Sequence, residues 1–504
     1  MGRALSVLWR APDLNPITGK ARSIPVLNPV DPYGRVFTFS WLGFMLSFWA
    51  WYAFPPLLTK TIKADLHLSA ADVANSNIVS LCATLLLRFA VGPVCDRYGA
   101  RITFASLMLL GCVPIGLAPL VRDAAGLCAA RFFIGVLGAT FVPCQVWCTA
   151  FFDSNVVGTA NALAGGWGNA GGGVTYFIMP AVFDSLVSRQ GMSDSTAWRV
   201  TLVVPLACLL TCALGMLFLC PDKPLDDDDD RKGRAQSIET RSSEADADEL
   251  RGAAAVPGTI TGSTTPDEEK GTPAESRRAA KDGTVAKPKW RATLSVVFCP
   301  QSLFHVATYA CSFGAELAIN SILASYLQAN FPTLSQTRAG NLAAVFGFLN
   351  FVARPLGGAV ADVLYNSFGH SLWLKKAWII CCGLVAGTLL IVIGRVDPSE
   401  QSGGGLGTMM ALIVLTAMFL EAGNGANFAL IPHVHPAANG VVSGITGGGG
   451  NLGGVLFSII FRLLGDGKGY GKAFWIIGAS HVGLNLAVSC IAPEPARQAG
   501  SQGP

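Results

Sequence analysis

The 504-residue sequence is poor in charged residues. Asp, Glu, Lys and Arg make up only 13% of the chain, whereas soluble globular proteins carry about 25%. Half of the acidic residues lie in one segment, between Asp222 and Asp282, so the rest of the chain is poorer still. Hydrophobic residues account for 51%. This composition argues against a soluble protein and indicates a chain that lies mostly within a lipid bilayer, with membrane lipid as a partner.

Several kinds of functional site are also missing from the sequence. The net charge of +4 is small, and without a lysine-rich stripe or an RNA-binding aromatic motif a nucleic-acid partner is not expected. The fourteen cysteines fall mainly in apolar stretches and show no zinc-site spacing, so we expect no metal, cofactor or disulfide framework. The sequence shows no nucleophile–base pair and no phosphate-binding loop, which argues against an enzyme.

Apolar stretches of about 20 residues, the length needed to cross a bilayer, occur twelve times. They lie at 36–58, 73–93, 102–121, 126–150, 157–183, 198–220, 300–328, 338–360, 374–394, 406–430, 438–464 and 473–492. Residues 222–292 separate the first six from the last six. This segment is acidic and nearly free of aromatic residues, so we expect it to be disordered. The predicted fold is an all-α membrane protein with 12 transmembrane helices in two pseudo-symmetric six-helix bundles, 36–221 and 293–492.

Basic residues beside the spans predict the orientation of the chain. The arginines and lysines of the first 35 residues, the pair Arg97 and Arg101, and the pair Lys375 and Lys376 fall on one side if the spans alternate. Some basic residues fall on the opposite side, so the bias is imperfect. We expect the more basic side to be the cytoplasm. Three segments are then predicted to be cytoplasmic: 1–35, the central loop 222–292 and the tail 493–504.

The second and eighth predicted spans carry the same pattern. One ends in Arg88-Phe-Ala-Val-Gly-Pro-Val-Cys-Asp96 and the other in Arg354-Pro-Leu-Gly-Gly-Ala-Val-Ala-Asp362. Each is the second span of its half, and such internal repeats are typical of secondary transporters, whose sites lie between the halves. Eight residues separate each arginine from the aspartate at the helix end, about 12 Å at ~1.5 Å per residue. Both arginines are therefore predicted near the bilayer midplane.

Two arginines at this depth need an explanation, since each costs at least ~2.5–3.5 kcal/mol on insertion scales. Each could pair with a carboxylate on a neighbouring helix, and Glu316 and Glu421 are the main candidates within the spans. Alternatively, Arg88 and Arg354 face each other across a cavity and hold an anion, because a guanidinium is permanently charged and presents a planar fork of donors. The scarcity of carboxylates favours the second interpretation, with a small anion as substrate.

Glycine-rich strings at 165–172 and 447–454 match in the fifth and eleventh spans, with an asparagine at the same place in each, Asn169 and Asn451. Glycine allows helices to approach closely and exposes backbone to a passing solute. We expect both asparagines to face the pathway. Helix packing alone is the alternative for most of the glycines. The glycines predicted to line the pathway are Gly165, Gly168, Gly171, Gly447, Gly450 and Gly453.

The stretch 92–101, Gly-Pro-Val-Cys-Asp-Arg-Tyr-Gly-Ala-Arg, resembles the motif between the second and third helices of the major facilitator superfamily. Residues 358–362 resemble its degenerate copy, and 131–135 are similar to that superfamily's fourth-helix motif. The resemblance implies the major facilitator fold. We expect charged residues of these loops to lock the cytoplasmic side in the outward-facing state: Asp96, Arg97, Arg101 and Asp362.

The paired glycine strings resemble the nitrate motifs of the nitrate/nitrite porter family, and 424–432 resembles that family's tenth span. Residues 20–29, 48–51 and the large central loop are similar to its fungal branch. The family implies nitrate and nitrite as substrates and two midplane arginines as anion ligands, which map to Arg88 and Arg354. The other site residues implied by the resemblance are Phe48 and Tyr309 as aromatic walls and Asn169 and Asn451 from the nitrate motifs.

The resemblance further implies import across the plasma membrane by alternating access, coupled to protons in the fungal branch. Glu316, Glu421 and His305 are titratable residues within the spans, although a structural role is the favoured interpretation for each. Two alternatives stay open. One is electroneutral exchange of nitrate for nitrite. The other is a nitrate sensor whose central loop binds a regulator or is phosphorylated by a kinase, for example near Ser237.

Overall fold

The computed structural model describes residues 8–16, 18–58, 60–153, 156–224, 295–398, 404–434, 439–464 and 469–493. Almost all of the predicted central loop, including Ser237, and almost all of the predicted tail lie outside the described residues. The domain boundaries drawn there therefore stay predictions.

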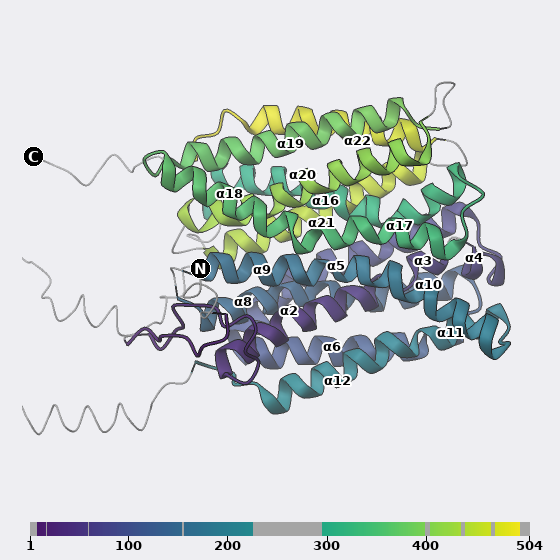
Figure 1. The fold of residues 1–504 in the computed structure, drawn as a ribbon, viewed down its shortest axis with the longest axis horizontal. Coiled ribbons are helices and arrows are strands. Elements are labelled where there is room, and N and C mark those ends of the chain that lie inside the picture. The colour runs from purple at the N-terminus through teal and green to yellow at the C-terminus, as the bar shows by residue number, and fades with distance from the viewer. Residues whose placement is uncertain are drawn as a thin grey trace, which may run out of the picture.

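The helices lie side by side along the longest axis of the molecule, and the first and last described residues lie at the same end, referred to below as the end of the termini (Figure 1). The N-terminal helices, purple to teal, form one half, and the C-terminal helices, green to yellow, form the other. The first half comprises α2 Pro32–Trp51, α3 Pro55–Leu58, α4 Thr61–Asp65, α5 Ala70–Tyr98, α6 Ala100–Leu117, η1 Ala118–Leu120, α7 Ala124–Ile134, η2 Gly135–Thr140, α8 Phe141–Phe151, α9 Val157–Asn169, α10 Gly171–Gln190, α11 Asp194–Thr201 and α12 Val203–Leu219. The second comprises α16 Pro300–Asn330, α17 Gln336–Phe348, η3 Leu349–Phe351, α18 Ala353–Ser367, α19 Leu372–Arg395, α20 Leu406–Val434, α21 Asn439–Leu464 and α22 Tyr470–Val488.

Helices occur at all twelve predicted spans. Eleven stretches of the described residues are long and apolar enough to cross a membrane. The twelfth predicted span, 473–492, corresponds to α22, which is helical over Tyr470–Val488 but is not among the eleven. The predicted fold class is confirmed: the chain is an all-α, multi-pass membrane protein with two halves of six spans each.

The fourth, fifth and eighth spans are interrupted inside the bundle, which hydropathy alone did not reveal, and the sixth changes helix at Leu202 nearer its start. The fourth span contains η2, the fifth changes helix at Ala170, and the eighth contains η3 just before α18. η2 packs closely against α5, because a Cβ on Gly138 would lie 2.5 Å from the hydroxyl oxygen of Thr84. The interruptions free backbone and side-chain polar groups at mid-depth, where discontinuous helices of transporters commonly form sites.

The N-terminal segment was predicted only as a polar cytoplasmic stretch, but its described part packs onto the first half. The amide of Ala21 donates to the carbonyl of Phe151 at 2.9 Å, and its carbonyl accepts from the amide of Asp153 at 2.9 Å. The side-chain amide of Asn15 donates to the Asp153 carboxylate at 2.9 Å. These bonds hold the segment against the end of α8, where the chain turns towards α9.

Hydrogen bonds between the two halves gather on the side away from the termini. Six such bonds occur within the described residues, and the five besides that of Arg88 involve residues nearer that side of the molecule. The pairs are Tyr52–Leu317, Thr61–Gln336, Asn75–Arg462, Arg88–Gly447, Tyr176–Asn320 and Asp184–Thr337. Hydrogen bonds between the halves are thus concentrated on that side within the described chain.

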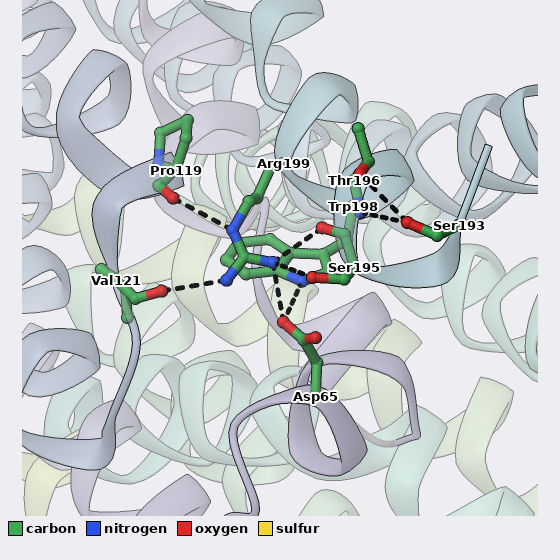
Figure 2. Close-up of polar contacts among 8 residues, drawn as sticks. All are labelled: Asp65, Pro119, Val121, Ser193, Ser195, Thr196, Trp198 and Arg199. Atoms are coloured by element: carbon green, nitrogen blue, oxygen red, sulfur yellow. Dashed lines mark hydrogen bonds and ion pairs between the residues drawn. The ribbon is translucent and has the colours of Figure 1, made fainter.

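On that same side, Asp65 at the end of α4 forms an ion pair with Arg199 of α11 (Figure 2). Nη1 of Arg199 lies 2.7 Å from Oδ2 of Asp65, and the indole N–H of Trp198 donates to the same oxygen at 2.9 Å. The guanidinium also donates to the carbonyls of Pro119 at 3.0 Å and Val121 at 3.1 Å. Arg199 thus links three segments of the first half: α4, the stretch that contains Pro119 and Val121, and its own helix α11.

We expect Asp65→Asn to lower the apparent melting temperature of the purified protein by a few degrees at pH 7. Partial burial raises the pKa of Asp65, but hydrogen bonds from Trp198, Ser195 and Arg199 and the charge of Arg199 outweigh it, so the pKa is lowered. A lowered folded-state pKa stabilises the fold fully above the unfolded value of ~3.9, and that contribution is lost as pH falls through the folded value.

The difference between Asp65→Asn and wild type should therefore shrink below pH ~4. Asp194→Asn is the matched control, because Asp194 is exposed on the same side of the molecule. Equal melting temperatures for wild type and Asp65→Asn at pH 7 would contradict a stabilising role for the ion pair between Asp65 and Arg199.

Candidate functional site

Arg88 lies buried on α5, with 4% of its surface exposed. Its Nε donates to the carbonyl of Gly138 in η2 at 3.1 Å. Its Nη1 donates across the interface to the carbonyl of Gly447 on α21 at 3.0 Å. Nη2 has no hydrogen-bond partner among the described residues. Two backbone carbonyls, one from each half, therefore hold the guanidinium in place and leave one nitrogen available.

Arg354 is the second residue of α18, directly after η3, and is 2% exposed. Its Nη2 donates to the hydroxyl of Tyr309 on α16 at 2.7 Å. Its Nη1 has no hydrogen-bond partner within the described chain. This second guanidinium is likewise fixed by the protein and left with an available donor.

An aromatic wall, defined as Phe141, Tyr309, Phe313 and Phe428, surrounds both guanidiniums. The ring centre of Phe313 lies 5.7 Å from the guanidinium carbon of Arg88 and 5.7 Å from that of Arg354. Phe141 lies 5.0 Å from the carbon of Arg88, and Phe428 lies 6.0 Å from that of Arg354. Because one ring reaches both cations, the wall joins the two arginines into a single site at the interface.

Sequence reasoning found only Tyr309 of this wall. Phe313 follows Tyr309 by one helical turn, and the two rings stack at 5.0 Å with 16° between their planes. That i, i+4 spacing was the available signal for Phe313. Phe428 lies within the stretch 424–432 that carries the family resemblance. Phe141 resembles many other apolar residues of the spans, so the sequence offered no signal for it.

Neither arginine is neutralised by a carboxylate in the described part of the chain. No carboxylate oxygen there lies within 4.0 Å of either guanidinium. Glu316 and Glu421, the candidates for such pairing, instead accept hydrogen bonds from Asn350. The interpretation in which each arginine pairs with a neighbouring carboxylate is therefore wrong for the structure described.

Each glycine string contacts the arginine of the opposite half. A Cβ on Gly447 would lie 3.5 Å from Nη1 of Arg88, and one on Gly165 would lie 3.8 Å from Nε of Arg354. The other predicted glycines pack against neighbouring helices instead. Their nearest neighbours are Phe44 for Gly168, Met45 for Gly171, Tyr309 and Phe313 for Gly450, and Ala310 for Gly453.

The two asparagines of the strings are both buried. Asn169 ends α9 beside the helix break, and neither of its amide atoms has a hydrogen-bond partner within the described residues. Asn451 donates to the carbonyl of Gly447 at 3.1 Å, the same carbonyl that accepts from Arg88. Both amides therefore retain hydrogen-bonding capacity in an otherwise apolar interior.

Phe48 is separated from the two guanidiniums by other aromatic side chains. Its ring stacks on Tyr52 at 5.0 Å and meets Phe44 edge-on at 5.8 Å. Phe44 in turn contacts Phe141 at 5.5 Å. Phe48 thus supports the aromatic wall through Phe44, and its predicted role as a lining residue stays a prediction.

The predicted gating residues of the first half lie at the C-terminal end of α5 and at the start of α6. Arg101 donates to the carbonyls of Leu217 and Cys220 and lies 3.6 Å from the Asp222 carboxylate. Arg97 is exposed. The side chain of Asp96 lies outside what the structure describes. In this state the described gate contacts stay within one half.

The second half shows a comparable contact at the same end. Nζ of Lys375 lies 2.7 Å from the Asp362 carboxylate and also donates to the carbonyl of Ala429 at 3.1 Å. An aspartate and a basic residue thus meet at this end of each half, Asp222 with Arg101 in the first and Asp362 with Lys375 in the second. The predicted locking role of these residues stays a prediction.

Residues 40–394 match the family model of the Major Facilitator Superfamily. The chain belongs to the Major Facilitator Superfamily. This facilitator is 33% identical to Elsinochrome transporter 1 of Elsinoe fawcettii, over 98% of its own length and 99% of that protein. It is 31% identical to High affinity nitrate transporter 2.5 of Arabidopsis thaliana, over 85% of its own length and 74% of that protein.

The resemblance to the nitrate/nitrite porter family is confirmed, and these relatives are named as transporters rather than enzymes. A crystal structure of the nucleoside transporter NupG superimposes with a TM-score of 0.55. That match covers 90% of this facilitator and 98% of the other chain at 14% identity, and it supports the fold alone.

We expect Gly453→Ala to destabilise this facilitator, whereas Gly444→Ala on the same helix should not. A Cβ at 453 would lie 2.0 Å from the carbonyl oxygen of Ala310, so α21 must move away from α16. A Cβ at 444 meets no atom of the described chain within 4 Å. Alanine is favoured over glycine within helices by about 1 kcal/mol. A loss of stability in Gly453→Ala would therefore result from the steric clash with the carbonyl of Ala310.

Thermal unfolding of the two purified variants measures the difference. Similar melting temperatures for both variants would show that the close contact between α16 and α21 does not constrain position 453.

Proposed function

We propose that this facilitator imports nitrate, and also nitrite, across the plasma membrane by alternating access. The observation that carries the proposal is the pair Arg88 and Arg354. Two buried guanidiniums from opposite halves share one aromatic wall, and neither has a carboxylate partner in the described chain. Buried cations are otherwise paired, so this arrangement is suited to an anionic cargo.

The chemistry of the site matches a small planar anion. Nη2 of Arg88 and Nη1 of Arg354 are the available donors. Nitrate spreads its charge over three oxygens in one plane, so it can accept from both guanidinium forks while its faces contact the rings of the aromatic wall. Asn169 and Asn451 add amide groups close to the same glycine strings. The nitrate transporters among the relatives support this substrate class.

The proposed cycle rocks the bundles 36–221 and 293–492 about the site. The bound anion neutralises the repulsion between the arginines and helps to draw the halves together. Without the anion, the empty carrier returns slowly to the outward-facing state, unless protons or a second anion assist. We propose that both termini and the central loop are cytoplasmic, and that Asp96, Arg97, Arg101 and Asp362 close that side in the outward-facing state.

A second candidate substrate comes from the relative that spans the whole chain. Elsinochrome transporter 1 matches 98% of this facilitator, and its name assigns it a different cargo. If this facilitator carries elsinochrome, it should take up that compound, or elsinochrome should inhibit its uptake of nitrate. Both compounds therefore belong in the same transport assay.

We expect Arg88→Lys and Arg354→Lys each to reduce nitrate uptake into proteoliposomes by at least about tenfold. Lysine keeps the positive charge but loses the planar fork, and one lost charge-assisted hydrogen bond is worth about 1.5–3 kcal/mol, more than a factor of ten. Arg189→Lys is the matched control, since Arg189 is exposed at the end of α10.

Near-normal transport by both lysine variants would contradict the role of the forks. In wild type, uptake driven by a proton gradient into vesicles without internal anion indicates symport. Uptake that requires internal nitrite indicates electroneutral exchange.

We expect deletion of residues 230–285, replaced by a short Gly-Ser linker, to leave the nitrate uptake rate within about twofold of wild type. The site lies entirely within the two bundles, so a transporter does not need the loop for its chemistry. Uptake should be compared at equal amounts of purified protein. A sensor that signals through this loop to a kinase or other regulator would instead lose its cellular output while its nitrate binding persists.

A further inference from the structure

Two carboxylates lie together in the interior of the second half. Glu316 on α16 is 3% exposed and Glu421 on α20 is fully buried. Asn350 of η3 donates from a single Nδ2 atom to Oε1 of Glu316 at 2.9 Å and to Oε1 of Glu421 at 3.0 Å. One amide nitrogen therefore bridges two acidic groups that come from different helices.

The remaining oxygens of the pair have different surroundings. Oε2 of Glu316 accepts a hydrogen bond from Nδ2 of Asn424 at 2.7 Å, and Ser312 holds that amide by donating to its oxygen at 2.6 Å. Oε2 of Glu421 has no hydrogen-bond partner among the described residues. Glu316 is thus placed as an acceptor through both oxygens, as a carboxylate is, whereas Glu421 keeps one oxygen on which a proton can reside.

No basic side chain of the described chain lies within 4.0 Å of either carboxylate. Two ionised carboxylates that share one amide in a buried interior repel each other, so the pair favours holding one proton. The titratable groups that interact with it from the packed elements are Arg354 of α18, Tyr309 of α16 and Tyr52 of α2.

We propose that Glu316, Asn350 and Glu421 form the proton-binding site of this facilitator, and that Glu421 takes up and releases the proton. Asn350 lies four residues before Arg354, so the acidic pair and the anion site share the η3–α18 segment. A proton on Glu421 removes a negative charge near Arg354, so anion binding becomes stronger. By linkage, a bound anion strengthens proton binding to the same extent. This inference rests on the proposed anion transport.

Nitrate binding to the purified protein as a function of pH tests the coupling. Wild type should bind nitrate more tightly as the pH falls. Glu421→Gln imitates the protonated state and should bind tightly at every pH in the range, while Glu421→Asp, which still ionises, should keep a pH dependence with a shifted midpoint. Asp397→Asn is the matched control: this carboxylate is also buried but bonds to Tyr326.

A second measurement separates failure of this inference from failure of the proposed function. In proteoliposomes, Glu421→Gln should retain nitrate counterflow and lose accumulation driven by a proton gradient. A variant that still accumulates nitrate, or that keeps the pH dependence of wild type, overturns the assignment of Glu421. A wild-type protein without any nitrate counterflow overturns the proposed function instead.

Discussion

Two permanently charged guanidiniums lie in a low-dielectric interior, and within the described chain dipoles rather than carboxylates hold them. Arg88 is held by the carbonyls of Gly138 and Gly447, and Arg354 by the hydroxyl of Tyr309. Dipoles fix the direction of each guanidinium without a direct ion pair to a described carboxylate, so each keeps its positive charge. That residual charge makes the interface between the halves a place for an anion, and the rest of the site is arranged around it.

The helix interruptions supply one of these dipoles and several other polar groups near the site. Gly138 belongs to η2, and its carbonyl accepts a hydrogen bond from Arg88. Asn350 belongs to η3 and precedes Arg354, so one short segment positions both the acidic pair and a ligand of the proposed anion. Asn169 ends α9 at the third interruption. Irregular backbone inside the membrane is tolerated only where such groups are buried in protein or line a pathway.

The sequence predicted the charged part of the site better than the apolar part. An arginine in an apolar span is conspicuous because burying it is expensive, so Arg88 and Arg354 could be placed at mid-depth from spacing alone. Phe141 and Phe313 could not, because one aromatic residue in a hydrophobic span looks like another until the helices are packed. The interruptions and the docked N-terminal segment were also missed, since both depend on contacts between residues distant in sequence.

The carbonyl of Gly447 accepts hydrogen bonds from both Arg88 and Asn451. Because this oxygen belongs to the opposite half, any separation of α5 from α21 strips Arg88 of an acceptor at the moment when the pathway changes. An anionic oxygen could then replace a peptide oxygen, so the cargo and the main chain would compete for one donor. Selectivity would in that case depend partly on the position of the Gly447 carbonyl oxygen. Single side-chain substitutions would not reveal this contribution.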